Sequence, residues 1–105
     1  MRRVVATPFP DDPLVTDSAS FGRAVRAART QSGLTLEDAA LAIGVAKQTV
    51  QDLETGKPTV GLGLALKIAQ ALGVAVWATP AQHKERSRRR LLESVESVAD
   101  ADHAA

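Results

Sequence analysis

The sequence predicts an all-α domain of four to five helices that ends in a short β-strand. Apolar residues recur at helical spacing between residues 18 and 72, and glycines and prolines cut this region into short segments. Residues 74–79 instead alternate with the period of a strand. The 105 residues are 45% hydrophobic but include only one Trp and two Phe, so we expect one small aliphatic core.

Composition narrows the class of protein. The chain has no cysteine, which excludes disulfides and thiolate metal sites and is typical of the cytoplasm. No apolar run approaches the roughly 18–20 residues of a membrane span, and the apolar run after the basic start is too short for a signal peptide. His83 and His103 have no ligand-like or triad-like neighbours in the sequence. We therefore expect a cytoplasmic protein that is not an enzyme, with no membrane partner, metal, cofactor or catalytic residue.

The formal net charge is only +1, but the charges are unevenly distributed. Acidic residues gather before residue 18 and after residue 92, which leaves the middle of the chain mildly basic. A mildly basic middle permits contact with phosphate without demonstrating it.

Residues 1–17 carry three prolines and an acidic pair, so we expect an irregular N-terminal arm in which RRVVAT is a candidate short strand. A helix follows from Ser18 or Ser20, either of which is a good N-cap, to about Gln31. The residues on its apolar face are Phe21, Ala24, Val25 and Ala28.

Three shorter helices are expected next. Thr35 caps a helix over residues 36–43, Gly44 provides a turn, and another helix spans about residues 47–55. Two short helices joined by a tight turn around a glycine form a helix-turn-helix. The last helix covers residues 62–72. Its expected buried residues are Leu62, Leu66, Ala69 and Leu72.

The stretch RTQSGLTLEDAALAIGVAKQTVQDLETGKPTV resembles the helix-turn-helix of the phage-repressor and Cro-like family, also called the XRE family. The resemblance covers about residues 18–72, and its ordered set of matches is specific although each match alone is weak. The matching residues are Arg29, Gly33-Leu34-Thr35, Ala40, Gly44-Val45, Val50, Leu53-Glu54 and Gly56-Lys57. The resemblance implies a lambda-repressor-like DNA-binding domain over residues 18–80, acting as a homodimeric transcriptional repressor on double-stranded operator DNA.

The third helix carries the residues expected to read bases. Val50 and Leu53 are expected to point into the core, so the opposite face points outward. Lys donates to guanine O6 and N7, and Gln pairs with adenine N6 and N7, which suits a major groove. Asp52 fits poorly near phosphates unless it accepts from cytosine N4. The expected base-reading residues are Lys47, Gln48 and Gln51.

A second set of residues is expected to contact phosphate. The resemblance implies an ion pair between Arg29 and Glu54 that ties the first helix to the end of the third and presents the guanidinium near a phosphate. A simple surface salt bridge is the alternative for this pair. The other candidates are Thr35 at the start of the second helix, Thr49, Thr55 and Lys57.

Three positions depart from the family pattern. Leu36 stands where a phosphate-gripping glutamine is usual, Ala46 where a capping Ser or Thr is usual, and Ala39 where a larger aliphatic is usual. The first two weaken the expected DNA contacts or helix capping. A protein-binding adaptor that has kept the fold and lost DNA binding is therefore an alternative.

The strand over residues 74–79 needs a partner for its backbone. Its β-branched residues, the lack of a cap after Gly73 and the nearby Pro80 argue against a fifth helix here. The partner is either residues 2–7 of the same chain or the same strand of a second subunit, which would give a two-fold antiparallel ribbon. The residues assigned to this dimer strand are Val74, Val76, Trp77 and Ala78.

A helix-turn-helix followed directly by a dimerising strand is similar to HipB-type antitoxins, the DNA-binding partners of HipA-like kinase toxins. The stretches SFGRAVRAAR and TVGLGLALKIAQALGVAVWATP carry this resemblance. It implies a protein that represses its own operon and restrains a HipA-like kinase toxin. A plain Cro-like or repressor-like regulator without a toxin is the alternative.

The tail over residues 81–105 has apolar residues at helical spacing, but its basic residues precede its acidic ones, which opposes the helix dipole. We expect a marginal helix or a disordered segment. The basic run suits flanking phosphates or an acidic partner surface, with a solvated segment as the alternative.

Overall fold

The computed structural model describes residues 3–104, and the side chains up to residue 94. The chain divides into two compact units. The first contains the arm up to Pro10 together with Val15–Val76, and the second contains Asp11–Leu14 together with the residues from Trp77 onward. No helix among the described residues combines the length and the apolar character needed to cross a membrane.

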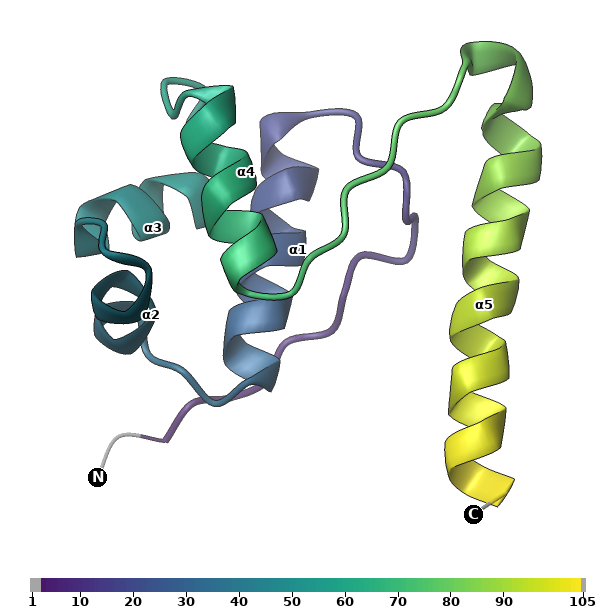
Figure 1. The fold of residues 1–105 in the computed structure, drawn as a ribbon, viewed down its shortest axis with the longest axis horizontal. Coiled ribbons are helices and arrows are strands. Elements are labelled where there is room, and N and C mark those ends of the chain that lie inside the picture. Colours follow the sequence, from purple (N-terminus) through teal and green to yellow (C-terminus); the bar gives the residue numbers. More distant parts are fainter. Residues whose placement is uncertain (1–2, 105) are drawn as a thin grey trace. The chain divides into compact units, whose positions relative to one another are not determined.

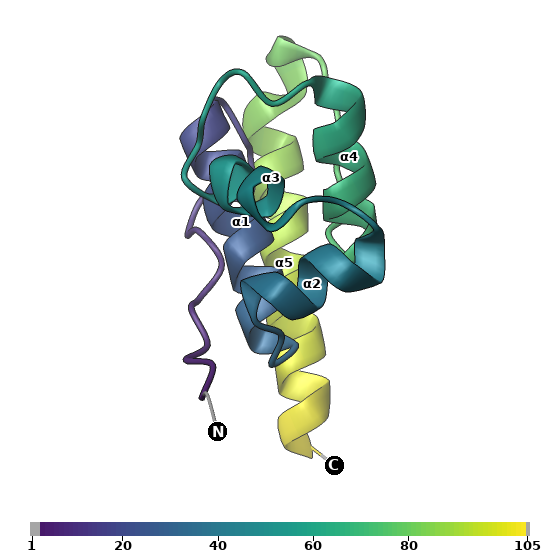
Figure 2. The ribbon, with the colours of Figure 1, turned by 90° about the vertical axis from the view of Figure 1, so that its left-hand side faces the viewer.

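Four helices build the first unit (Figure 1), which confirms the predicted all-α class. They are α1 (Ser18–Gln31), α2 (Leu36–Ile43), α3 (Lys47–Glu54) and α4 (Leu62–Ala71). Apart from the start of α1, where the sequence left Ser18 and Ser20 open, their bounds match the sequence-based expectations to within a residue, because a glycine with positive φ follows the end of each helix. Helix α3 packs against both α1 and α2 (Figure 2), so its orientation is set by two neighbours.

The cap of α1 differs from the expected serine. Asp17 is the N-cap, and its carboxylate accepts a hydrogen bond from the Ser20 backbone N–H at 2.7 Å. The Ser20 hydroxyl lies 3.4 Å from the Asp17 backbone N–H and completes a capping box. Ser20 therefore stabilises the start of α1 from inside the helix, and the hydrogen bond from Ser20 lowers the pKa of Asp17.

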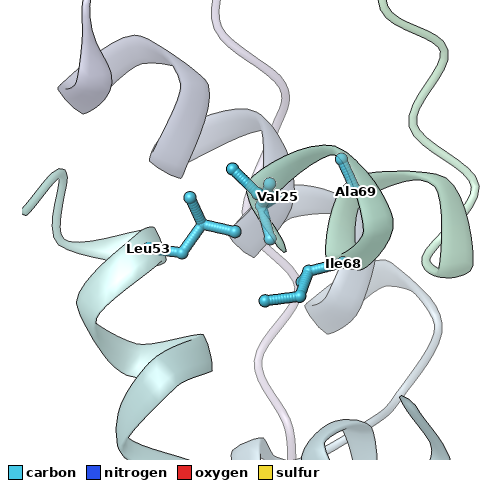
Figure 3. Packing of buried hydrophobic residues seen from close by; sticks show 5 residues of the cluster. Val25, Leu53, Ile68 and Ala69 are labelled. Carbon is cyan, nitrogen blue, oxygen red and sulfur yellow. The ribbon is translucent and has the colours of Figure 1, made fainter. Parts of the chain in front are cut away.

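The core lies where α1, α3 and α4 meet (Figure 3). It is built from Val25, Leu53, Ala65, Ile68 and Ala69. The expected face of α4 was partly wrong, because Ala65 and Ile68 are buried while Leu62 is 71% exposed. Leu62 shares their helical stripe but borders an open hollow of about 500 Å³ that Phe21 and Val60 also line.

Gly22 allows α1 and α3 to cross closely. A Cβ atom at this position would overlap the backbone carbonyl oxygens of Leu53 and Glu54. Only a glycine therefore permits the end of α3 to lie directly on the first turns of α1. This close crossing fixes where the rest of α3 points.

The strand expected over residues 74–79 is not formed in the single chain. Residues 74–80 have no regular secondary structure, and no described segment pairs with them as a strand. Residues 2–7 were one of the two expected partners, and of these Arg2 lies outside the described residues. The described part of this segment is held against the end of α1, where the Thr7 backbone N–H donates to the Thr30 hydroxyl at 3.0 Å. A strand requires a second backbone, and within the described chain none is supplied.

The second unit is organised around helix α5 (Lys84–Ala104), which follows the short 3₁₀ turn η1 (Ala81–His83). Arg88 of α5 donates to both carboxylate oxygens of Asp12, with Nε–Oδ1 at 3.0 Å and Nη2–Oδ2 at 3.2 Å. Arg88 also pairs with Glu85 one turn earlier. These hydrogen bonds from Arg88 lower the pKa of both carboxyl groups.

Candidate nucleic-acid interface

Helix α3 has one buried side and one exposed side. Val50 and Leu53 are 0% and 5% exposed. The opposite side carries Lys47, Gln48 and Gln51, all of which are exposed. The three residues expected to read bases are therefore available to a ligand along one helix face.

Lys47, the first of these residues, is paired with a carboxylate. Lys47 Nζ lies 2.7 Å from Glu37 Oε1, and the two side chains are 50% and 46% exposed. The pair joins the start of α3 to the first turn of α2. Sequence reasoning did not identify Glu37, because the two residues are ten positions apart and lie on different helices.

Gln48 and Asp52 form a second contact on the same face. Gln48 Nε2 donates to Asp52 Oδ1 at 2.8 Å, and Lys57 Nζ lies 3.8 Å from Asp52 Oδ2. A carboxylate only accepts hydrogen bonds, so the amide nitrogen of Gln48 must face Asp52. The Gln48 carbonyl oxygen and its second amide hydrogen then stay free, and these are the groups that pair with adenine. The i,i+4 spacing of the two residues is a signal that a search for such pairs would find.

Arg29 and Glu54 form the ion pair that the resemblance implied, and the pair is buried. Arg29 Nε and Nη2 donate to Glu54 Oε2 and Oε1 at 2.6 and 2.9 Å, and the two side chains are only 8% and 6% exposed. Arg29 Nη1 also donates to the Leu34 carbonyl oxygen at 2.7 Å. One guanidinium thus ties α1 to the end of α3 and to the loop before α2.

The threonines expected to contact phosphate are partly engaged in local hydrogen bonds. Thr35 is half-buried and its hydroxyl accepts from the Asp38 backbone N–H at 3.1 Å, which caps α2. The Thr55 hydroxyl donates to the Gln51 carbonyl oxygen at 3.0 Å. Thr49 is half-buried, and Lys57 is exposed just after α3. Ala46, the N-cap residue of α3, makes no side-chain capping hydrogen bond, as expected of an alanine.

The residues assigned to a dimer strand do not share one environment. Val74 packs against the core, whereas Val76 and Trp77 are 48% and 72% exposed and Ala78 is also exposed. The described residues contain no group of three or more His, Asp or Glu side chains placed to hold a metal ion.

Comparisons with known proteins agree with the helix-turn-helix fold. A family model described as helix-turn-helix matches residues 25–76. The uncharacterized HTH-type transcriptional regulator y4mF of Sinorhizobium fredii is 36% identical over 58 residues, which cover 55% of this chain and 76% of that protein. A HipB–O4 20mer complex shares the fold with a TM-score of 0.59 and 24% identity, covering 65% of this chain and 96% of that one. A HipA–HipB–O2–O3 complex matches with the same TM-score and coverage at 22% identity.

Proposed function

This chain belongs to the XRE-type helix-turn-helix family of transcriptional regulators, and on that basis we propose that it represses transcription by binding operator DNA as a homodimer. The observation that carries this proposal is the exposed face of α3, with Lys47, Gln48 and Gln51 on one side and a buried aliphatic face on the other. Such a helix fits a major groove, where its polar side chains reach base edges.

Each base-reading residue has a defined chemistry. Lys47 exchanges its contact with Glu37 for guanine O6 and N7, which costs little because the ion pair is exposed. Gln48, whose amide is oriented by Asp52, presents an oxygen to adenine N6 and a nitrogen to adenine N7. Gln51 lies next along the same face and reads a neighbouring base.

Phosphate contacts hold α3 in register. Thr35 and the backbone N–H groups at the start of α2 form one contact, and Thr49, Thr55 and Lys57 form others. Arg29 contributes mainly by positioning, since its guanidinium is buried against Glu54 and Leu34.

We propose that residues 74–79 pair with the same residues of a second copy. The Val74 backbone N–H donates to the Ala69 carbonyl oxygen at 2.9 Å, but residues 75–79 make no backbone hydrogen bond among the described residues, and Val76 and Trp77 expose apolar surface. An unpaired extended segment is a template for strand addition. Two-fold pairing would place two α3 helices for successive half-sites of an operator.

The similarity to HipB structures, one of them in a HipA–HipB–O2–O3 complex, supports a finer proposal. We propose that this chain is an antitoxin that also binds and restrains a HipA-like kinase toxin. A kinase-like protein encoded beside this chain, and its co-purification with the chain, are the expected observations. Absence of such a neighbour would leave a plain transcriptional regulator.

Binding to DNA tests the central proposal. We expect the full chain to prefer a duplex from its own promoter over a scrambled duplex, with an affinity that falls steeply as salt rises. Lys47→Ala should lower the preference by about 1–3 kcal/mol, because it removes a base contact. Fluorescence anisotropy on both duplexes measures this. Weak binding without salt dependence would instead favour a protein-binding adaptor.

A substitution within residues 74–79 tests the dimer. Val76→Pro removes a backbone donor from the middle of the proposed ladder. We expect sedimentation to show monomers and operator affinity to fall, while Val76→Thr should preserve the dimer. A dimer that survives Val76→Pro would place the interface elsewhere in the chain.

A further inference from the structure

The N-terminal arm is pinned to α1 although it has no regular secondary structure. The Thr7 backbone N–H and hydroxyl lie 3.0 and 3.1 Å from the Thr30 hydroxyl, and Gln31 Nε2 donates to the Thr7 carbonyl oxygen at 2.9 Å. The arm therefore runs back along the C-terminal end of α1 (Figure 2). Arg3 of the arm lies beside residues of α2 and the start of α3.

This arrangement creates a basic hollow of about 390 Å³ between the arm, α1 and α2. Four cationic side chains and one carboxylate line it: Arg3, Arg26, Arg29, Lys47 and Glu37. Arg29 is paired with Glu54, and Lys47 with Glu37. The guanidinium groups of Arg3 and Arg26 are exposed and have no hydrogen-bond or ion-pair partner among the described residues. Two cations on its rim are thus available to an anion.

We infer that this hollow is a binding site for a backbone phosphate of the DNA, which Arg3 and Arg26 contact. The inference rests on the proposed function, because Lys47 and Thr35, which line the same hollow, would then already lie against the duplex. Leu36 also lines it and offers no donor, so the arginines supply the charge that α2 lacks there. Arg3 lies outside the 25–76 region that matches the family model, whereas Arg26 lies inside it, so the contact from the arm is the part that is additional to the helix-turn-helix.

The salt dependence of binding to a scrambled duplex tests the proposed phosphate-binding site, and this test does not require the operator sequence to be known. Each lost phosphate contact lowers the slope of log affinity against log salt by about 0.9. We expect that decrease for Arg26→Gln and for Arg3→Gln. Arg23→Gln is the matched control, because Arg23 is an exposed arginine on the same helix that does not line the hollow. Unchanged slopes in both hollow variants, or an equal decrease in Arg23→Gln, would overturn the inference.

Two further readouts separate this inference from its alternatives. A phosphate contact does not depend on base sequence, so Arg3→Gln should lower the affinity for A·T-rich and G·C-rich scrambled duplexes equally. A loss of affinity that is confined to A·T-rich DNA would mean that Arg3 reads the minor groove, and it would contradict the phosphate-binding site. If Lys47→Ala leaves operator preference intact, the base-reading proposal fails, while the slopes on scrambled DNA still decide about the hollow.

Pinning of the arm can be tested in the same assay. Thr30→Val keeps the shape of a side chain that is 6% exposed and, combined with Gln31→Ala, removes the hydrogen bonds that hold Thr7. In this background we expect Arg3→Gln to have no further effect on the slope, whereas Arg26→Gln should keep its effect. An undiminished effect of Arg3→Gln would contradict the pinned arm. If the combined variant does not fold, the single variants at Arg3 and Arg26 decide alone.

Discussion

The two sides of helix α3 differ in how firmly their polar groups are held. On the core side, Glu54 joins Arg29 in a buried pair whose side chains are 8% and 6% exposed. On the solvent side, Lys47 joins Glu37 in a pair whose side chains are 50% and 46% exposed. Both pairs have short contacts, so distance does not distinguish them. Solvent access does.

This difference separates residues that orient α3 from residues that act on a ligand. A buried charge that loses its partner stays desolvated, which strongly opposes exchange. An exposed pair has a small net energy and can trade its partner for a base or a phosphate. The chain thus places its permanent contact on one side of α3 and its exchangeable contacts on the other.

The largest expected effect comes from breaking the permanent contact. Glu54→Gln removes the carboxylate that faces the buried Arg29 guanidinium, and we expect a loss of about 3–5 kcal/mol in unfolding free energy. Chemical denaturation followed by circular dichroism measures this loss. If stability is unchanged and only DNA affinity falls, Glu54 acts at the DNA and not at the crossing of α1 and α3.

A smaller effect is expected where Asp52 orients Gln48. Asp52→Asn replaces an acceptor by an amide that can donate or accept, so the Gln48 amide loses its fixed orientation. We expect operator preference to fall by on the order of 1 kcal/mol, within the value of a single base contact. Affinity for scrambled DNA should rise, because a carboxylate near phosphates is removed.

A double-mutant cycle separates these two consequences. In a Gln48→Ala background, Asp52→Asn should no longer change operator preference, because there is no amide left to orient. The gain on scrambled DNA should remain, since it depends only on charge. An additional loss of preference in the double variant would mean that Asp52 contacts a base itself.

The helices of the first unit could be predicted because their signals are local. Thr35 and Gly44 mark the two ends of α2, and the apolar face of α3 follows from the spacing of Val50 and Leu53. The cap of α1 was assigned to the wrong residue because Asp17 and Ser20 satisfy each other, and the sequence does not say which of the two lies outside the helix.

The remaining features depend on partners that are distant in sequence or absent from the chain. Thr7 meets Thr30 across 23 residues, and no periodicity predicts that contact. Lys47 meets Glu37 across a turn between two helices. The strand over residues 74–79 was expected from alternation, yet alternation does not supply a second backbone. Its pairing with a second copy stays a prediction.

The smallest expected effect comes from removing the carboxylate of the exchangeable pair. Glu37→Gln should change unfolding free energy by about 0–1 kcal/mol, because the Lys47–Glu37 pair is half exposed. Its affinity for scrambled DNA should nevertheless rise, since a negative charge disappears beside the hollow and Lys47 becomes available to phosphate. Glu93→Gln removes the same charge from an exposed position on α5 and is the matched control. A rise of equal size in Glu93→Gln would assign the effect to net charge and would remove the functional distinction between the two sides of α3.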